Sequence, residues 1–348
     1  MTNFAIFFFF CLLGWIAPHS WGGPEEALFK VEISVTSQTE KERENNTQQA
    51  LLRLLTKVTG LKNIPRSEEV LASLKEPGRF YSGFSYKENT ETQDFTITYN
   101  FDKNLVLDLV RESNLPYWWS DRPRVVVWLA LEEGSEKILS SSDNHIFQAL
   151  LRERADERGI SLKLPIMDVE DRRLISYKEL RSGLAYNIDA ASVRYSSNIS
   201  LIGKVEASEL SFDEPYFDGS WEFWFEDEHF NVDFETLSAR ESAQIGVDLV
   251  ADIFAARFAV FSGSEKKYNW IITGITDLSK YVGLKNYFEN LEIIDEFFIS
   301  NLSRDQVTLN ISSRASEQKI RELLIKKKVI HVDPFYRGPN SRFRWGKG

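Results

Sequence analysis

Two clusters of carboxylates are the densest sets of side chains that could do chemistry in this sequence. Asp168, Glu170 and Asp171 form the first cluster, and residues 226–228, Glu-Asp-Glu, form the second. A hydrolase can use one carboxyl group as an acid and another as a base when their surroundings separate the two pKa values. The simpler interpretation is that both clusters are solvated acids of loops and turns. A carboxylate-dependent hydrolase therefore stays open only as an alternative.

Other catalytic and metal-binding patterns are missing from the sequence. No two of the histidines His145, His229 and His331 lie four residues apart, and none belongs to an H-E-x-x-H motif. This argues against a zinc site. The calcium loop D-x-[DN]-x-[DN]-G, the G-x-S-x-G elbow, a complete S-x-x-K motif set, the Walker A motif and G-x-G-x-x-G are also absent. We predict a protein that is not an enzyme, with no cofactor and no metal.

Aromatic residues beside acids are the most unusual feature. In residues 221–225, WEFWF, alternation places Trp221, Phe223 and Phe225 on one strand face and Trp224 on the other. Aromatic residues on two faces indicate either a strand packed on both sides or one face used to bind a protein partner or a glycan. The second interpretation predicts a recognition surface drawn from this set: Trp118, Trp119, Trp224, Glu226, Asp227 and Glu228.

The N-terminal segment predicts export. Residues 5–17, AIFFFFCLLGWIA, form an apolar run that is short for a membrane span, and Pro18 ends it. Ser20 and Gly22 fit the positions read by a signal peptidase, so residues 1–22 are predicted to be a signal peptide. Because no basic residue precedes the run, a retained inner-membrane anchor is the alternative.

Cysteine usage and charge narrow the class of protein further. Cys11, the single cysteine, lies inside the predicted signal, so the mature chain would carry no disulfide. This favours a bacterial periplasm over a eukaryotic secreted protein. The net charge of −10 argues against nucleic-acid binding, and no second apolar stretch is long enough to span a membrane. The sequence does not specify the oligomeric state.

Charge is distributed unevenly along the chain. Residues 206–241 hold twelve acids and one base, Arg240, whereas the chain from Lys326 onward holds seven bases and one acid, Asp333. These two stretches are either solvated faces or surfaces that contact each other or a partner.

Hydrophobic patterning divides the remainder into domains. Residues 27–115 are predicted to be a small α+β domain. Its expected elements are a strand (28–35), a helix ended by Gly60 (39–59), a short helix (67–75), a strand pair (80–87 and 94–101) and a helix (104–112).

Residues 122–262 are predicted to be an α/β domain. Residues 124–131, with Trp128, form a nearly continuous apolar strand that should be buried on both faces. The other expected elements are helices at 146–158, 188–195 and 239–261, strands at 162–166 and 199–205, and a hairpin of 221–225 with 230–237.

Residues 267–333 show the strand and helix order βαββαβ, which is typical of a ferredoxin-like sandwich. Residues 334–348 have little to bury and are predicted to be a mobile basic tail.

Five segments resemble a family of exported gammaproteobacterial proteins, catalogued as the domain of unknown function numbered two thousand and sixty-six. They are ALFKVEISV (27–35), QALLRLLTKVTG (49–60), NLPYWWSDRPRVVVWLALEEG (114–134), GSWEFWFED (219–227) and GVDLVADIFAARFAV (246–260). The resemblance implies an exported multidomain protein and supplies no activity and no catalytic residues.

Together these features predict a non-enzymatic interaction or assembly protein that acts on a complex of the cell envelope, with protein partners in the periplasm. The first alternative is a module that binds polysaccharide or peptidoglycan, and the second is the carboxylate-dependent hydrolase.

Overall fold

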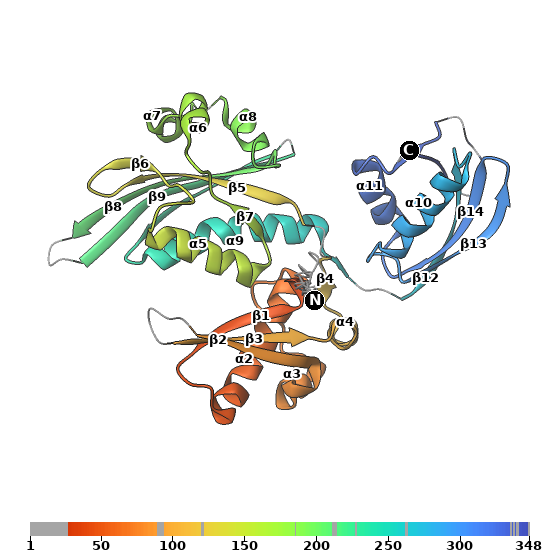
Figure 1. Ribbon diagram of the computed structural model, residues 1–348, viewed down its shortest axis with the longest axis horizontal. Helices are drawn as coiled ribbons and strands as arrows, with labels where there is room; N and C mark the ends of the chain where they lie inside the picture. Colours follow the sequence, from red (N-terminus) through yellow and green to blue (C-terminus); the bar gives the residue numbers. More distant parts are fainter. Residues whose placement is uncertain are drawn as a thin grey trace, which may run out of the picture.

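The computed structural model describes residues 27–88, 94–119, 122–184, 186–210, 214–226, 228–261, 264–334, 336, 338 and 341–346. The predicted signal peptide (1–22) and Asp227 lie outside these residues. The chain forms a multidomain α+β and α/β fold in which three domains each carry their own sheet (Figure 1). The predicted fold class is therefore confirmed.

The N-terminal domain packs one long helix on a three-stranded antiparallel sheet. Its elements are β1 (Lys30–Val35), α2 (Glu40–Thr59), α3 (Glu68–Lys75), η1 (Pro77–Phe80), β2 (Tyr81–Glu88), β3 (Phe95–Phe101) and α4 (Lys103–Glu112), with sheet order β1-β3-β2. Alternation in β1 buries Val31, Ile33 and Val35, and these meet the apolar stripe of α2. Gly60 ends α2 with a φ of 73°, as its position predicts.

The middle domain is built on a larger mixed sheet. Its strands are β5 (Arg124–Glu132), β6 (Glu136–Ile138), β7 (Ser161–Lys163), β8 (Ser200–Leu210), β9 (Glu214–Phe225) and β10 (Glu228–Thr236). The order is β10-β9-β8-β5-β6, and β7 also pairs with β5. Strand β5 therefore has strand neighbours on both sides, and residues 125–131 are buried, as their apolar composition predicts.

Helices cover both faces of this sheet. On one face lie α5 (Ile146–Arg158) and α9 (Ala239–Phe258), between the sheet and the N-terminal domain; on the other lie α6 (Val169–Leu174), α7 (Tyr177–Ser182) and α8 (Ile188–Val193) (Figure 1). The sequence did not predict β6, α6 or α7, because these elements are three to six residues long and carry little periodicity.

Trp128 lies at the centre of the α6–α8 face. Its side chain is fully buried, and its indole Nε1 donates a hydrogen bond to Ser192 Oγ of α8 at 2.9 Å. This confirms the predicted burial and the predicted acceptor for the indole N–H.

Trp221 occupies the matching position on the α5–α9 face, between two glycines. A Cβ on Gly203 of β8 would come within 2.5 Å of the indole, and one on Gly246 of α9 within 2.4 Å. Both positions therefore need glycine so that the helix and the sheet can close on this ring.

The C-terminal domain follows the predicted order with one addition. Its elements are β12 (Lys266–Thr273), α10 (Leu278–Glu289), β13 (Glu296–Ser303), β14 (Gln306–Ser313), α11 (Glu317–Lys326), β15 (Ile330–Val332) and β16 (Ser341–Trp345), with sheet order β13-β14-β12-β16-β15. Strand β16 enters between β12 and β15, parallel to the first and antiparallel to the second.

The prediction of a mobile tail over residues 334–348 is wrong for residues 341–345. Phe343 and Trp345 of β16 are buried in the C-terminal core, and alternation with Arg342 and Arg344 gives the strand one buried face. The short basic segment concealed this pattern, because only two of its residues are apolar and buried. The predicted domain limit at Asp333 therefore excludes a strand of the sheet.

The domains meet at a two-stranded ribbon. Strand β4 (Pro116–Tyr117) pairs with β11 (Val260–Phe261), so the segment that leaves the first domain lies against the segment that leaves the second. Trp118 then packs in the middle core and Trp119 in the C-terminal core.

We expect Trp128→Ala to unfold the middle domain readily. The change leaves a large cavity and removes the donor to Ser192, and changes of this kind cost roughly 3–5 kcal/mol. Trp128→Phe keeps most of the volume and should cost less. Urea denaturation followed by circular dichroism measures both, and an unchanged midpoint for Trp128→Ala would contradict the central position of β5.

We expect a chain that ends at Asp333 to lose the cooperative unfolding of its C-terminal domain. The truncation removes two buried aromatic residues and the partner of β15, a loss comparable to the usual stability of a domain, about 5–15 kcal/mol. A chain that ends at Gly346 keeps β16 and serves as the control. In calorimetry, the chain that ends at Gly346 should show one more unfolding transition than the chain that ends at Asp333. Identical melting curves would show that β16 is dispensable.

Candidate functional site: a cleft between the middle and C-terminal domains

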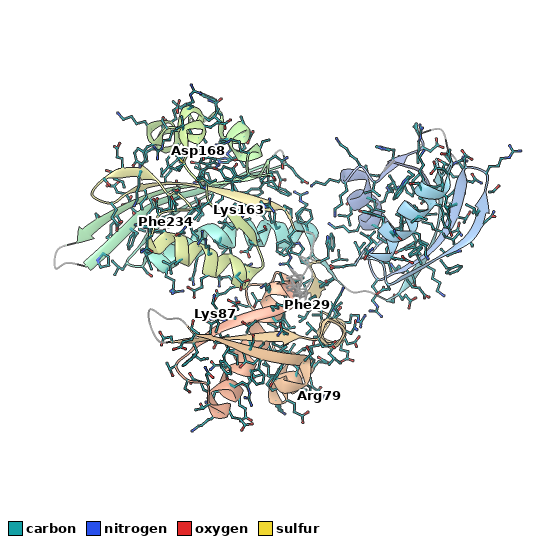
Figure 2. The ribbon with its side chains drawn as sticks, in the orientation of Figure 1. Phe29, Arg79, Lys87, Lys163, Asp168 and Phe234 are labelled. Carbon is teal, nitrogen blue, oxygen red and sulfur yellow. The ribbon has the colours of Figure 1, made fainter. Side chains whose placement is uncertain are left out.

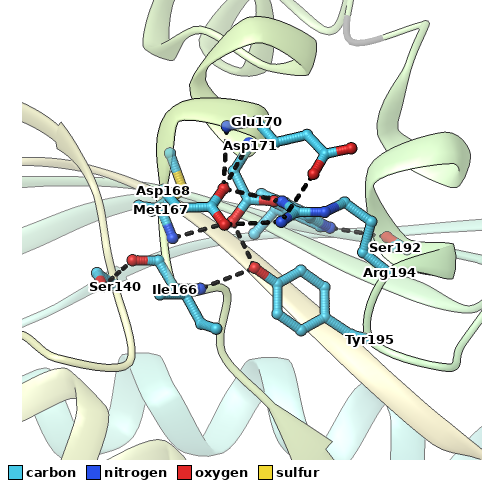
Figure 3. A network of polar contacts seen from close by, with 10 residues as sticks. Ser140, Ile166, Met167, Asp168, Glu170, Asp171, Ser192, Arg194 and Tyr195 are labelled. Carbon is cyan, nitrogen blue, oxygen red and sulfur yellow. Dashed lines mark hydrogen bonds and ion pairs between the residues drawn. The ribbon is translucent and has the colours of Figure 1, made fainter.

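The first carboxylate cluster is held by one arginine in the helical layer that faces away from the N-terminal domain (Figures 2 and 3). Arg194 pairs with Asp168 at 2.7 Å, with Glu170 at 3.2 Å and with the buried Asp171. Asp168 also caps α6 by accepting from the backbone N–H groups of residues 170 and 171. Asp171 in turn accepts hydrogen bonds from the Tyr195 hydroxyl and from the Met167 backbone N–H.

The protonation behaviour of this cluster agrees with a positioning role. Hydrogen bonds from Arg194 lower the pKa of Asp168 to about 2. Burial, followed by the hydrogen bond to Asp171, raises the pKa of Tyr195 to about 12. Neither group exchanges a proton near neutral pH, and both tie α6 to the end of α8. The alternative of a hydrolase built on Asp168, Glu170 and Asp171 gains no support from this geometry.

Trp118 and Trp119 do not form a recognition surface. Both side chains are buried, one in the middle core and one in the C-terminal core. The prediction that they contribute to an exposed platform is wrong, because the segment that contains them lies where three domains meet and each indole is covered by a different domain. Trp119, which is 5% exposed, still lines the cleft between the middle and C-terminal domains.

Trp224 is the aromatic residue of the predicted set that is exposed. Trp221, Phe223 and Phe225 are buried against α9, whereas Trp224 is on the opposite face of β9 and is 53% exposed. His229 of β10 lies flat against its indole, with ring centroids 4.0 Å apart. One face of the indole is thereby supported by the protein.

Contacts between side chains of neighbouring strands position the residues around this stacked pair. Glu222 Oε1 accepts from Lys204 Nζ at 2.6 Å, and Glu222 Oε2 is 3.6 Å from His229 Nε2. All three side chains come from adjacent strands, β8, β9 and β10, so the sheet register positions them.

Trp224 lines a cleft of about 820 Å³. The floor is the part of the sheet where Ser200, Ile202 and Glu222 lie; α7, α8 and their connection form one wall, and α11 of the C-terminal domain forms the other. Tyr186, which is 86% exposed, and Asn198 also line the cleft. A volume of this size accommodates a ligand larger than a single small metabolite fragment.

Glu226 connects the middle domain to α11 at the edge of the cleft. Its carboxylate pairs with Lys326 of α11 and, at 3.3 Å, with Arg257 of α9. The hydrogen bond from Lys326 lowers the pKa of Glu226, and Lys326 Nζ is also 5.1 Å from the centre of the Phe225 ring. The acidic stretch and the basic C-terminal stretch thus contact each other here. Glu228 pairs with the same Arg257, at 3.0 Å.

Metal binding has no candidate here: across the described ranges, no group of three or more His, Cys, Asp or Glu side chains is placed to hold an ion. His145 instead caps α5, where its ring accepts from the Phe147 backbone N–H. Among the same residues, no helix has the length and apolar character needed to cross a membrane.

Sequence reasoning missed most residues of the cleft. Tyr186 and Asn198 lie far in the chain from Lys326, and no catalytic or binding motif connects the three. The one available signal was Trp224, whose place on the polar face of an otherwise buried strand marked it as unusual.

Among known protein families, a match is found for the N-terminal part of the chain. Residues 24–119 match a family model described as "Domain of unknown function (DUF8605)". The matched region contains the N-terminal α+β domain and the Tyr117-Trp118-Trp119 segment. No curated protein and no solved structure matches the chain.

We expect Arg194→Met to return the pKa of Asp168 from about 2 toward its ordinary value of about 3.9. Because the pKa is depressed in the folded state, the pair stabilises the fold fully above about pH 3.9, and this contribution is lost as the pH falls toward about 2. Carboxyl NMR titration should find Asp168 ionised at about pH 3 in the parent and mostly protonated in the variant. Arg181→Met, which removes a pair with Glu206, is the control. Equal titration in all three proteins would contradict the role of Arg194.

Proposed function

We propose that this protein is a non-enzymatic interaction protein of the cell envelope, which binds an envelope component in the cleft between its middle and C-terminal domains. The observation that carries this proposal is the exposed indole of Trp224. It is supported on one face by His229 and lines a cleft of about 820 Å³.

The energetics of that position favour a binding role. A large aromatic side chain that remains half exposed loses the favourable burial that its neighbours on the same strand gain. Here the exposed ring is also held in one orientation, so a ligand that covers it would lose little entropy in ordering it.

Export and the location in the envelope are part of the same proposal. They are supported by the apolar run at residues 5–17, by the absence of cysteine after residue 11, and by the resemblance to exported envelope proteins. Removal of residues 1–22 as a signal peptide would release the three domains into the periplasm.

A photo-reactive phenylalanine derivative at position 224 tests the proposal in intact cells. We expect irradiation to yield a discrete adduct in the envelope fraction, because the derivative replaces one aromatic ring of the cleft with another. The matched control carries the photo-reactive derivative at position 84 instead, where Phe84 of the N-terminal domain is 41% exposed. This control should yield no adduct.

Three outcomes would contradict the proposal, two on binding and one on location. Adducts of equal yield at both positions would indicate contact by collision, and no adduct at position 224 would indicate that the cleft is empty in the envelope. Recovery of the protein from the cytoplasm would contradict the proposed location.

A further inference from the structure

The cleft continues into a second cavity in the C-terminal domain. This cavity, of about 920 Å³, lies along α10 and shares three lining residues with the first: Trp119, Leu323 and Lys327. Trp119 is at the junction of the domains and the other two belong to α11 or follow it directly. The two cavities are therefore adjacent, and together we call them the groove.

We propose that this groove binds an uncharged oligosaccharide chain, with sugar units placed in both cavities. The inference rests on the proposed function and names the class of ligand for the same site.

The first cavity offers aromatic faces. Trp224 and Tyr186 are exposed there, and Trp224 has only one face occupied, by His229. The apolar C–H face of a pyranose ring packs on such a surface while its hydroxyl groups point away.

The second cavity offers neutral hydrogen-bonding groups. Asn286, Ser279 and Tyr287 line it from α10, together with Asn290, which follows the helix, and the charged residues Lys280, Glu292 and Lys327. An amide side chain has donors and an acceptor in one plane, and a hydroxyl group both donates and accepts. The amide and hydroxyl groups match the hydroxyl groups of a sugar.

Both glutamates that line the first cavity are paired within the protein. Glu222 pairs with Lys204 and Glu226 with Lys326. A ligand that bound either glutamate or Lys326 by charge would have to break one of these pairs, whereas a neutral chain leaves them in place.

A peptide bound as an added strand fits the groove less well. The floor strands are interior, because β8 lies between β5 and β9, and β9 lies between β8 and β10. Their backbone groups are already paired, so an extended peptide finds no strand edge in the first cavity. The groups that remain for recognition are side chains.

Calorimetric titration of the purified mature chain with chito-oligosaccharides and cello-oligosaccharides tests this inference. We expect the affinity to rise from a disaccharide to a hexasaccharide, because a longer chain reaches both cavities. Trp224→Ala should weaken binding of either length roughly tenfold or more, and Trp224→Tyr, which keeps a ring face, should retain most of the affinity.

Asn286→Ala tests the contribution of the second cavity alone. The residue is exposed on α10, and alanine is the best helix former, so the variant should fold. It should weaken hexasaccharide binding while leaving disaccharide binding unchanged. Phe84→Ala, on the N-terminal domain, should match the parent for every ligand.

The inference is overturned if neither series binds, if affinity does not depend on length, or if Trp224→Ala binds like the parent. If the sugars fail to bind but a protein adduct still forms at position 224, the ligand is a protein; the sugar assignment is then wrong and the proposed function stands. If the adduct is also absent, both are wrong.

Discussion

Arg122 occupies the point where the three domains meet, and its guanidinium is surrounded by backbone carbonyl groups. It donates hydrogen bonds to the carbonyl oxygens of Lys57 (2.7 Å), Trp118 (2.7 Å), Gly159 (2.8 Å) and Trp119 (3.1 Å). Burial lowers the pKa of Arg122 to about 9, so it remains charged at neutral pH. The planar fork of arginine serves several acceptors at once, which a lysine ammonium cannot do in this geometry. One side chain thus fixes the end of α2, the turn after α5 and the linker that carries the two tryptophans.

The first and second domains are joined by further buried charge. Arg158, fully buried, donates to Asp248 and Asp252 of α9 and to the Gly60 carbonyl oxygen of the N-terminal domain. Burial would raise the pKa of Asp248, but hydrogen bonds from Arg154 and Lys62 outweigh it and lower this pKa. Removing one partner from such a network leaves a buried charge alone and is strongly destabilising. The C-terminal domain contacts the middle domain differently. Trp119 anchors it, and the pair between Lys326 and Glu226 is partly exposed, so that pair contributes little, about 0–1 kcal/mol. The groove lies across this second, more solvated contact.

The sequence by itself determined the elements of each domain. Alternation in residues 28–35, the stripe of α2 with Gly60 at its end, the apolar β5 with Trp128 and the βαββαβ order all follow from side-chain periodicity and capping, which act within a few residues. The separation of Trp224 from Trp221, Phe223 and Phe225 follows from the same two-residue period. Short elements such as α6 and α7, and the strand β16 inside a basic segment, were missed because their local signal is weak and contacts from distant parts of the chain stabilise them.

Only the tertiary structure decided which exposed groups share a surface. Trp118, Trp119 and Trp224 are equally aromatic in the sequence, yet the first two are buried in different cores and the third is exposed in a cleft. Asp168 and Asp171 have the composition of an acid and base pair, yet Arg194, more than twenty positions away, holds both. The groove joins Tyr186 and Asn198 in one domain to Lys326 in another. Side-chain periodicity carries no information about such contacts, because they depend on how the three cores pack together around Arg122.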